Sequence, residues 1–446
     1  MEATTPNSAR PARGEELELH VEGLAQGGRG IARRDGFVVF VSGALPGDTV
    51  RARISRSKRG YAEATALELI EPAADRVADV CVHDGEPCPG APWQGMAYER
   101  QLEHKHQQVD EALRRLGGLD GFELEPIVPA VAGWRYRNKL EYSFGEREGE
   151  AVLGFHRRGS WREVVDVDDC HLASEANNAA RNAVREWARA QGLPAHDTET
   201  ETGVLRNLVV RDAARTGQVQ TRLVTSRAQF PRPPVDLHTV IDGPTGGTDG
   251  PTGVLGDEYL EEELGGLRFR ISHSAFFQTN TEMAERLYGL AREFAGLAGS
   301  ERVFDLYCGI GTIALMLARD AGEVWGMEIV PDAIADAEHN AKRNAIANAR
   351  FRAADARIGV RPLIEEAGKP DVVVVDPPRA GLSKKVVRRL IECEAPRIVY
   401  ISCNPTTLAP NAAQLVEAGY ALRRVRPVDM FPQTPHVECV TLLERG

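Results

Sequence analysis

The chain lacks four features that would each point to a particular class of protein. No apolar run approaches membrane-spanning length, which argues against a helical membrane protein. No internal repeat is apparent, so a repeat array is not expected. The seven cysteines are odd in number and no signal peptide precedes them, which predicts reduced thiols in a cytoplasm. A basic excess is also missing: the net charge is -11, so affinity for a polyanion has to come from local basic patches.

The chain is long enough for several domains. Its 446 residues exceed a single hydrophobic core, and about three domains are expected. The contents of 42% hydrophobic and 27% charged residues are typical of a soluble globular protein.

Residues 300–446 alternate buried apolar runs with helical patterns, and this alternation predicts a doubly wound α/β domain, whose bounds are expected at 266–446. The helical patterns lie near residues 313–319, 331–347, 383–393 and 407–418. The residues that follow the predicted strands include Gly309, Glu328, Asp355, Asp376 and Cys403. Open α/β sheets bind ligands at the carboxyl ends of their strands, so these residues predict the functional site.

Cys403 ends the apolar run Ile398–Ser402 and precedes Asn404 and Pro405, which suit the cap and first turn of a helix. A thiolate that faces a helix N-terminus is stabilised by the helix dipole, which predicts a nucleophile active near neutral pH. A packed core thiol is the common alternative for a lone cysteine.

A glycine turn follows the strand that ends at Leu306, with glycines at positions 309 and 311. Glu328 lies about 20 residues after these glycines. At this distance from the glycine turn, a carboxylate typically accepts hydrogen bonds from the ribose hydroxyls of a nucleotide. The same pattern would suit a nicotinamide or flavin enzyme. Asp305 argues against that alternative, because a carboxylate just before the turn suits a cationic ligand better than a pyrophosphate.

The motifs of this region resemble those of the RNA uracil-5-methyltransferase family, and the resemblance runs over nearly the whole chain. It rests on Phe276-Phe277-Gln278-Thr279-Asn280, Asp305 to Gly311, Asp376-Pro377-Pro378-Arg379, Ser402-Cys403-Asn404-Pro405 and His436-Val437-Glu438. Two positions depart from some members of the family: Thr312 and Asp355 both stand where other members have Asn.

The resemblance implies a methyltransferase that uses S-adenosylmethionine, with the cofactor contacted by Gln278, Tyr307, Glu328 and Asp376. It implies that Cys403 attacks C6 of uracil, which makes C5 nucleophilic enough to take the methyl group. Glu438 would then remove the C5 proton as the general base. Taken without the motif, Glu438 would be interpreted as a solvated strand residue.

The N-terminal part predicts a polar tail over residues 1–14 and a small β-barrel over residues 15–74. The expected strands are Leu17 to Val21, Phe37 to Val41, Asp48 to Ile54 and Ala62 to Leu69. Alternation places Arg51 and Arg53 on one solvent face, followed by Arg56, Lys58, Arg59 and Tyr61. This face predicts phosphate binding with an aromatic platform, although a merely soluble strand face is the alternative. The segment resembles a TRAM domain through Gly30 to Arg33, Gly36 to Val41 and Leu45 to Asp48.

The middle part, residues 75–265, predicts an α+β domain that also binds RNA. A helix is expected from Tyr98 to Leu116, and strands from Lys139 to Phe144, Ala151 to His156 and Leu208 to Arg211. Trp134 to Lys139 resembles a family motif and mixes base-stacking with phosphate-binding residue types, although a basic edge strand is the plain alternative. Residues 228–256 are rich in Pro, Gly, Thr and Asp and predict a flexible insertion.

Many family members carry an iron–sulfur cluster on four cysteines, and the positions that match here are Cys81, Cys88, Ala91 and Cys170. Because Ala91 lacks the thiolate that a four-cysteine cluster needs, no metal is expected. A cluster would require a substitute ligand such as His83 or His171.

The fold class expected is therefore α/β: a doubly wound, Rossmann-like methyltransferase domain after a small OB-like TRAM barrel and an α+β central domain. The function expected is methylation of uracil C5 in RNA by a cytoplasmic monomer, with 23S ribosomal RNA favoured over transfer RNA through the resemblance of the barrel. A dinucleotide-dependent oxidoreductase and a non-catalytic RNA-binding protein are the alternatives. Mere binding would need neither Cys403 nor Glu438.

Overall fold

A computed structural model describes residues 10–446 except 84, 158–159, 161, 198, 227–230, 234, 236 and 243–256. The chain divides into two compact units, one made of Met1–Gln108 with Phe431–His436 and the other of Val109–Met430 with Val437–Gly446. Most of the predicted tail and of the predicted insertion at 228–256 lies outside the described residues. In the described part of the chain, no helix is both long and apolar enough to cross a membrane.

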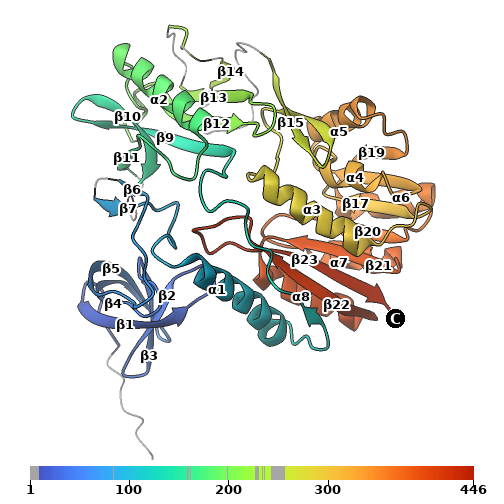
Figure 1. Ribbon diagram of the computed structural model, residues 1–446, viewed down its shortest axis with the longest axis horizontal. Coiled ribbons are helices and arrows are strands. Elements are labelled where there is room, and N and C mark those ends of the chain that lie inside the picture. Colours follow the sequence, from blue (N-terminus) through green and yellow to red (C-terminus); the bar gives the residue numbers. More distant parts are fainter. Residues whose placement is uncertain are drawn as a thin grey trace, which may run out of the picture. The chain divides into compact units, whose positions relative to one another are not determined.

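The first unit begins with a closed five-stranded barrel in the order β1-β2-β3-β5-β4 (Figure 1). Its strands are β1 (Glu16–Leu24), β2 (Gly30–Arg34), β3 (Phe37–Ser42), β4 (Thr49–Ser57) and β5 (Ala62–Glu71). Alternate residues point inward, so that Val50, Ala52 and Ile54 of β4 are buried. The four strands predicted here are present, and β2 is a fifth that the sequence analysis missed. Closure leaves the barrel without a free edge.

The first unit continues with the short hairpin of β6 (Val82–His83) and β7 (Glu86–Pro87) and with helix α1 (Tyr98–Glu111) as far as Gln108. The predicted helix reaches Leu116 as expected, but its last five residues, Ala112–Leu116, form a π-helical turn. Gln101 of α1 donates a side-chain hydrogen bond to the Gln433 side chain at 2.8 Å, which explains why Phe431–His436 belongs to this unit.

The second unit holds a six-stranded sheet in the order β11-β10-β9-β12-β13-β14. Its strands are β9 (Lys139–Arg147), β10 (Glu150–His156), β11 (Val164–Asp166), β12 (Leu205–Asp212), β13 (Val219–Thr225) and β14 (Leu237–Asp242). Helix α2 (Glu175–Ala190), which the sequence analysis did not predict, contacts β10, β12 and β13. Ser174 caps it by accepting a hydrogen bond from the backbone N–H of Asn177.

A hairpin of β15 (Tyr259–Leu264) and β16 (Leu267–Ser272) follows. The domain boundary predicted between residues 265 and 266 falls in the turn of this hairpin, whose strands pair with each other over their whole length. Because β15 and β16 pair with each other across this boundary, the predicted domain bounds remain a prediction.

The C-terminal part of the second unit is an eight-stranded sheet in the order β19-β18-β17-β20-β21-β23-β22-β8 (Figure 1). Its strands are β8 (Glu123–Leu124), β17 (Arg302–Leu306), β18 (Glu323–Glu328), β19 (Ala349–Ala353), β20 (Val372–Val375), β21 (Arg397–Ser402), β22 (Tyr420–Val428) and β23 (Glu438–Arg445). The five strands from β19 to β21 are parallel, and β23 is antiparallel to both β21 and β22. The predicted doubly wound sheet is confirmed, and β8 joins it from the region predicted as the central domain.

The helices of this part are α3 (Thr281–Ala295), α4 (Thr312–Leu317), α5 (Pro331–Arg343), α6 (Ala356–Ala367), α7 (Lys384–Cys393) and α8 (Pro405–Glu417). Residues of α6, α7 and α8 share one hydrophobic core with Phe304 and Leu306 of β17. Asp305 lies between these two residues on the same strand, so its side chain points to the opposite face. The sequence analysis missed α3 and α6; α6 contains Pro362, which is unfavourable within a helix.

Candidate active site

The carboxyl ends of neighbouring parallel strands bring the predicted site residues to one edge of the sheet. Strands β17, β18 and β20 end just before Tyr307, at Glu328 and just before Asp376, and β21 ends just before Cys403. Tyr307 has a φ of 72°, which is unfavourable for a residue with a side chain, and Gly309 and Gly311 also have positive φ. Such backbone strain is typical of a site whose geometry serves a ligand.

Glu328 is held at the end of β18 by backbone groups. Its carboxylate accepts hydrogen bonds from the N–H of Ile329 at 2.7 Å, Val330 at 3.1 Å and Gly309 at 3.3 Å. It borders a cavity of about 270 Å³ whose lining also includes Tyr307, Met327, Ala354, Asp355 and Ser383. A partly apolar cavity with a fixed carboxylate suits a nucleoside.

Asp355 has a structural partner. It caps α6 by accepting a hydrogen bond from the backbone N–H of Arg357 and forms an ion pair with the side chain of the same residue. The pair keeps the pKa of Asp355 below its usual value, so this residue lines the cavity as a paired carboxylate.

Two further acids point to a cationic ligand. Burial, with Asp376 nearby, raises the pKa of Asp305 to about 8, and burial raises the pKa of Asp376 to about 7. Neither carboxylate oxygen of Asp305 has a partner at hydrogen-bond geometry among the described residues, although the nearby backbone N–H of Ala314 offsets part of the rise in its pKa. A cation would stabilise both carboxylates in their charged form, so these residues fit the sulfonium and ammonium groups of S-adenosylmethionine.

Gln278 lies in a loop that precedes α3 and is 7% exposed. Asn138 holds this loop: its side chain donates hydrogen bonds to the Gln278 backbone carbonyl at 3.1 Å and to the Thr281 hydroxyl at 2.9 Å. Tyr288 of α3 lies beside the Gln278 side chain. Burial, with Asp376 nearby, raises the pKa of Tyr288, which therefore stays a neutral phenol.

The sequence analysis missed Tyr288. It lies near four of the site's polar residues, Gln278, Asp305, Asp376 and Glu438, yet it sits inside a helix that the sequence pattern did not reveal. Only the packing of α3 on the sheet brings it there.

Cys403 and Glu438 meet because β21 and β23 are antiparallel neighbours. Ser402 pairs with Cys439, so the next residues along the ladder are Cys403 and Glu438. As predicted, Asn404 caps α8 and Pro405 occupies its first turn. Glu438 is 3% exposed, and its Oε2 atom is buried without a hydrogen-bond partner among the described residues. Burial, with Asp376 nearby, raises its pKa, which suits a group that accepts a proton.

The surroundings of Cys403 in the protein without ligand oppose the thiolate that the helix N-terminus would favour. Burial, followed by the carboxylates of Glu438 and Asp376, raises the pKa of this thiol to about 12. Two acidic neighbours oppose the favourable helix N-terminus. The thiolate therefore needs added positive charge or a proton acceptor before it can form.

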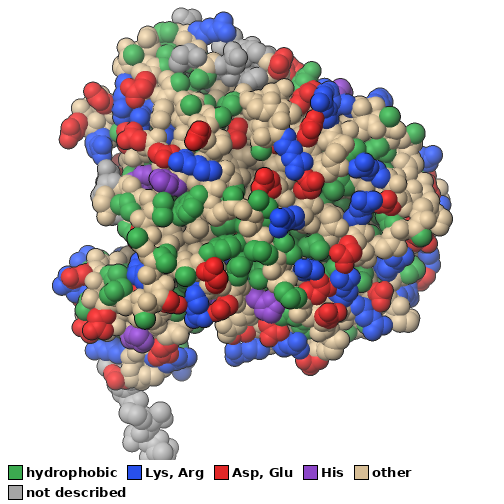
Figure 2. All heavy atoms as spheres, in the orientation of Figure 1, with side chains coloured by type: hydrophobic (Ala, Val, Ile, Leu, Met, Phe, Trp, Pro, Cys, Tyr) green, Lys and Arg blue, Asp and Glu red, His purple; other side chains and the backbone are tan. Residues whose placement is uncertain are grey.

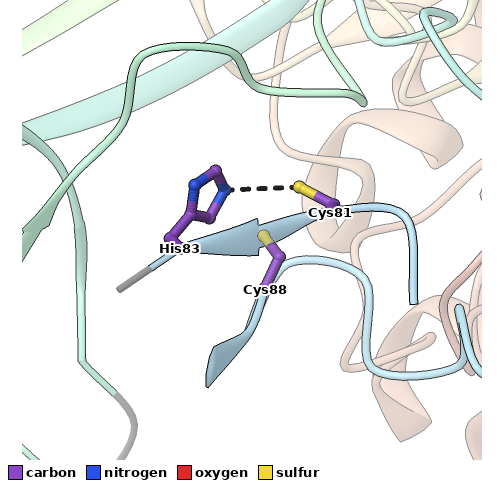
Figure 3. A group of neighbouring side chains, drawn as sticks. All are labelled: Cys81, His83 and Cys88. Carbon is purple, nitrogen blue, oxygen red and sulfur yellow. Dashed lines mark hydrogen bonds between the residues drawn. The ribbon is translucent and has the colours of Figure 1, made fainter. Parts of the chain in front are cut away.

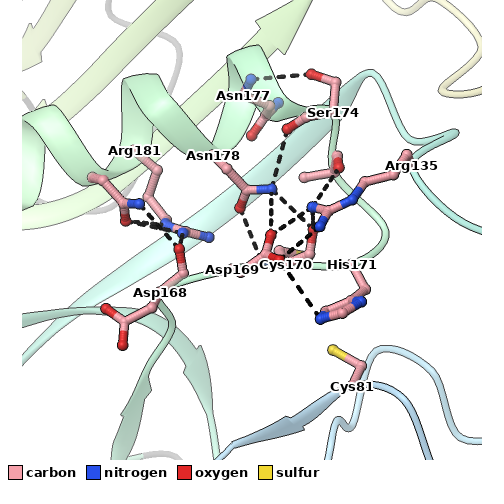
Figure 4. Close-up of polar contacts among 12 residues, drawn as sticks. Cys81, Arg135, Asp168, Asp169, Cys170, His171, Ser174, Asn177, Asn178 and Arg181 are labelled. Atoms are coloured by element: carbon pink, nitrogen blue, oxygen red, sulfur yellow. Dashed lines mark hydrogen bonds and ion pairs between the residues drawn. The ribbon is translucent and has the colours of Figure 1, made fainter.

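The segment from Trp134 to Lys139 is largely built into the fold. Tyr136 is 9% exposed and Asn138 is 5% exposed. Arg135 forms an ion pair with Asp169 and donates a hydrogen bond to the backbone carbonyl of Cys170 (Figure 4). Asn138 supports the Gln278 loop, whereas Arg135 is paired with Asp169 and Tyr136 is buried. The prediction that Trp134 to Lys139 contacts RNA is not tested by these positions.

The barrel face that carries Arg51 and Arg53 shows the predicted alternation of apolar and basic residues, but its net positive charge is lower than expected. Arg51 forms an ion pair with Glu68, and Arg53 forms one with Glu16. On the face of the molecule that Figure 2 shows, acidic and basic side chains are intermixed. A surface depression at the start of the barrel is more basic: it is lined by Arg10, Arg13, Arg56, Lys58, Ser55, Ser57 and Glu63.

Comparisons with known proteins agree with this geometry. The sequence profile of the TRAM domain matches residues 11–67, and that of the tRNA (uracil-5-)-methyltransferases matches residues 248–446. A protein of Halalkalibacterium halodurans named as an uncharacterised RNA methyltransferase is 38% identical over 444 residues, which cover 96% of each chain. A protein of the same description from Caldanaerobacter subterraneus is 38% identical over 454 residues, covering 98% of this chain and 100% of the relative.

A solved structure matches at full length. It is the tRNA (uracil-54, C5)-methyltransferase of Pyrococcus abyssi in complex with S-adenosyl-L-homocysteine, with a TM-score of 0.77 and 27% identity. The match covers 96% of this chain and 100% of that one. The strand-end site, the barrel and these full-length likenesses agree, and the chain belongs to the RNA uracil-5-methyltransferase family, enzymes that methylate RNA with S-adenosylmethionine.

Proposed function

We propose that the protein methylates C5 of a uridine in 23S ribosomal RNA through a covalent bond between Cys403 and C6 of the base. The observation that carries this proposal is the position of Cys403 beside the buried carboxylate of Glu438, next to the strand ends that suit the cofactor. The alternative of a dinucleotide-dependent oxidoreductase is set aside because of the family to which the chain belongs.

Each residue has one task in this mechanism. Glu328 binds the ribose hydroxyls, Tyr307 and Gln278 position the cofactor, and Asp376 accepts hydrogen bonds beside it. S-adenosylmethionine supplies the methyl group and a positive charge. That charge would favour the thiolate of Cys403, whose pKa is raised by burial and by the neighbouring carboxylates.

The reaction begins at the sulfur atom of Cys403. The Cys403 sulfur forms a bond to C6, and the C5–C6 double-bond electrons move into an enolate of the base. C5 then takes the methyl group, while the bond between the methyl carbon and the sulfonium sulfur would break and S-adenosylhomocysteine would leave. Glu438 then accepts the C5 proton, the double bond re-forms, and the bond between sulfur and C6 breaks to release the thiolate.

Transfer RNA is the second candidate substrate, favoured by the likeness to the Pyrococcus abyssi enzyme. To distinguish the two candidate substrates, purified protein is incubated with tritiated S-adenosylmethionine and total RNA from a deletion strain. The position of 5-methyluridine is then mapped in each RNA class. Label in 23S ribosomal RNA alone is expected. Label confined to transfer RNA would refute the substrate, and an absence of 5-methyluridine in all RNA would refute the reaction.

We expect cofactor binding to strengthen as the pH rises, because a cation beside Asp305 needs the ionised carboxylate. With its pKa near 8, Asp305 is protonated in the unliganded protein at pH 6, and binding must displace that proton. The dissociation constant for S-adenosylhomocysteine, which keeps the ammonium group, should fall by up to about tenfold per pH unit between about pH 6 and pH 7.5. Calorimetry in buffers of different ionisation enthalpy measures the released proton.

Asp305→Asn should flatten this pH dependence. Asp371→Asn is the matched control, since Asp371 lies at the opposite end of the sheet, just before β20, and is exposed. A slope unchanged in Asp305→Asn would show that another group binds the cation.

For RNA binding we expect the unpaired basic residues of the barrel to matter most. Arg56 and Lys58 border the basic depression, whereas Arg51 and Arg53 are each neutralised by a glutamate. Arg56→Gln with Lys58→Gln should reduce the log–log salt slope of RNA binding by roughly 1.4 to 1.8. Arg51→Gln with Arg53→Gln is the matched control and should change it by less than about one.

Saturated single-turnover rates should stay unchanged in both barrel variants, because phosphate contacts position the RNA without reading its bases. Equal slopes in the two double variants would mean that the depression does not bind phosphate.

We also infer that the enzyme acts in the cytoplasm as a monomer. All seven cysteines lie in the described part of the chain and none is in a disulfide, which supports a reducing compartment.

A further inference from the structure

The first unit contains a cluster of metal-binding side chains that the active site does not use. Cys81, His83 and Cys88 offer two sulfur atoms and a ring nitrogen that all lie within 4.8 Å of one another (Figure 3). The Sγ atom of Cys81 is 3.3 Å from Nε2 of His83. Cys81 is 0% exposed and Cys88 is 2% exposed, while His83 is partly buried.

The geometry of the β6–β7 hairpin explains why these side chains converge. Val82 pairs with Pro87 and His83 with Glu86, so Cys81 and Cys88 are the next opposite pair, joined by the hydrogen bond from Cys88 N–H to the Cys81 carbonyl at 2.9 Å. Side chains two residues apart on a strand share a face, and so do directly opposite residues. Both rules place the three side chains on one face.

The backbone behind the cluster is braced. The side chain of Gln94 accepts a hydrogen bond from the Cys81 N–H at 2.7 Å and donates one to the Cys81 carbonyl at 2.8 Å. Such support limits the reorganisation needed when a metal binds.

These residues do not fit the four-cysteine cluster that the family resemblance implied. Ala91 is buried and its N–H is hydrogen-bonded to the Cys88 carbonyl, so a methyl group stands at the position of the third thiolate. His83 adds a nitrogen ligand in place of a sulfur. Two cysteines and one histidine are instead a donor set that suits a single zinc ion.

We propose that Cys81, His83 and Cys88 bind one zinc ion, with water at the fourth position. Tetrahedral zinc would place sulfur and nitrogen ligands about 3.6 Å apart, close to the separation of Cys81 and His83. Two thiolates neutralise the charge of the ion, and their protons leave on binding. The strands of this hairpin are only two residues long, so the metal would hold it together.

Metal analysis of the full-length protein tests this proposal. The protein is purified anaerobically without chelators from cells supplied with both iron and zinc. About one zinc per chain, little iron and no colour are expected. Near four irons with acid-labile sulfide, or neither metal, would overturn the proposal.

Substitutions then identify the ligands. Cys88→Ser and His83→Ala should lose at least about tenfold in zinc affinity, whereas His83→Cys should keep the metal. His20→Ala, an exposed histidine of the barrel, is the matched control and should keep one zinc. Circular dichroism checks that each variant is folded, and retention of zinc in folded His83→Ala would remove His83 from the site.

Substitution of cobalt for zinc gives an absorption spectrum that depends directly on the ligands of the metal. A residue that only stabilises the fold would not change this spectrum. Cobalt in the wild-type site should show sulfur-to-metal charge transfer and the strong visible bands of tetrahedral coordination. The charge-transfer intensity should fall in Cys88→Ser and rise in His83→Cys. Equal spectra in all three proteins would refute the ligand assignment.

Discussion

Cys403→Ala should abolish methyl transfer, lowering the single-turnover rate by at least about 10³-fold, because the variant lacks the sulfur that forms the bond to C6. Binding of S-adenosylhomocysteine should change by less than about threefold, since the residues that suit the cofactor lie at the ends of β17, β18 and β20. Rapid-quench transfer of a tritiated methyl group measures the rate, and calorimetry measures binding.

Cys393→Ala is the matched control for the loss of a thiol. Cys393 is 0% exposed in the hydrophobic core at the end of α7, away from the strand ends that form the site. This variant should transfer methyl groups at close to the wild-type rate. Turnover of Cys403→Ala at a similar rate would refute the covalent mechanism.

Glu438→Gln should trap the protein on its RNA. Attack by Cys403 and methyl transfer need no base at C5, whereas elimination requires removal of the C5 proton. The amide cannot accept that proton, so the methylated adduct should accumulate and multiple turnover should fall by at least about 10²-fold. Denaturing gels of the protein with labelled RNA detect the covalent species.

The double variant Cys403→Ala with Glu438→Gln separates this adduct from other cross-links. It keeps the altered base position but lacks the attacking sulfur, so no band should remain. If Glu438→Gln alone forms no adduct and still turns over, the C5 proton is removed by another group.

Much of the catalytic part could be predicted from the sequence because its information is local. Each parallel strand is a short, fully apolar run, and the residue that follows it must lie at the carboxyl edge of the sheet. Glu328, Asp376 and Cys403 were placed correctly on this basis. The cap at Asn404 is equally local, since it depends on neighbours two residues away.

The helices and the strand that were not predicted lack such local signals. Helix α6 contains Pro362, and α3 follows a loop that mixes apolar and polar residues, so neither helix has a clear sequence pattern. Tertiary packing stabilises both helices, and packing alone brings Tyr288 among the acids of the site. The short strand β2 was missed because it lies between glycine turns.

The sequence alone determined the family, the doubly wound sheet, the barrel and the residue types of the active site, because strand period and motif spacing are properties of the chain. Only the tertiary structure decided how these side chains behave. Burial, with the carboxylates of Glu438 and Asp376, raises the pKa of Cys403. Glutamates from other strands neutralise Arg51 and Arg53, and a hairpin brings His83 to two cysteines. Charge, burial and metal binding depend on neighbours in space, which a linear pattern does not contain.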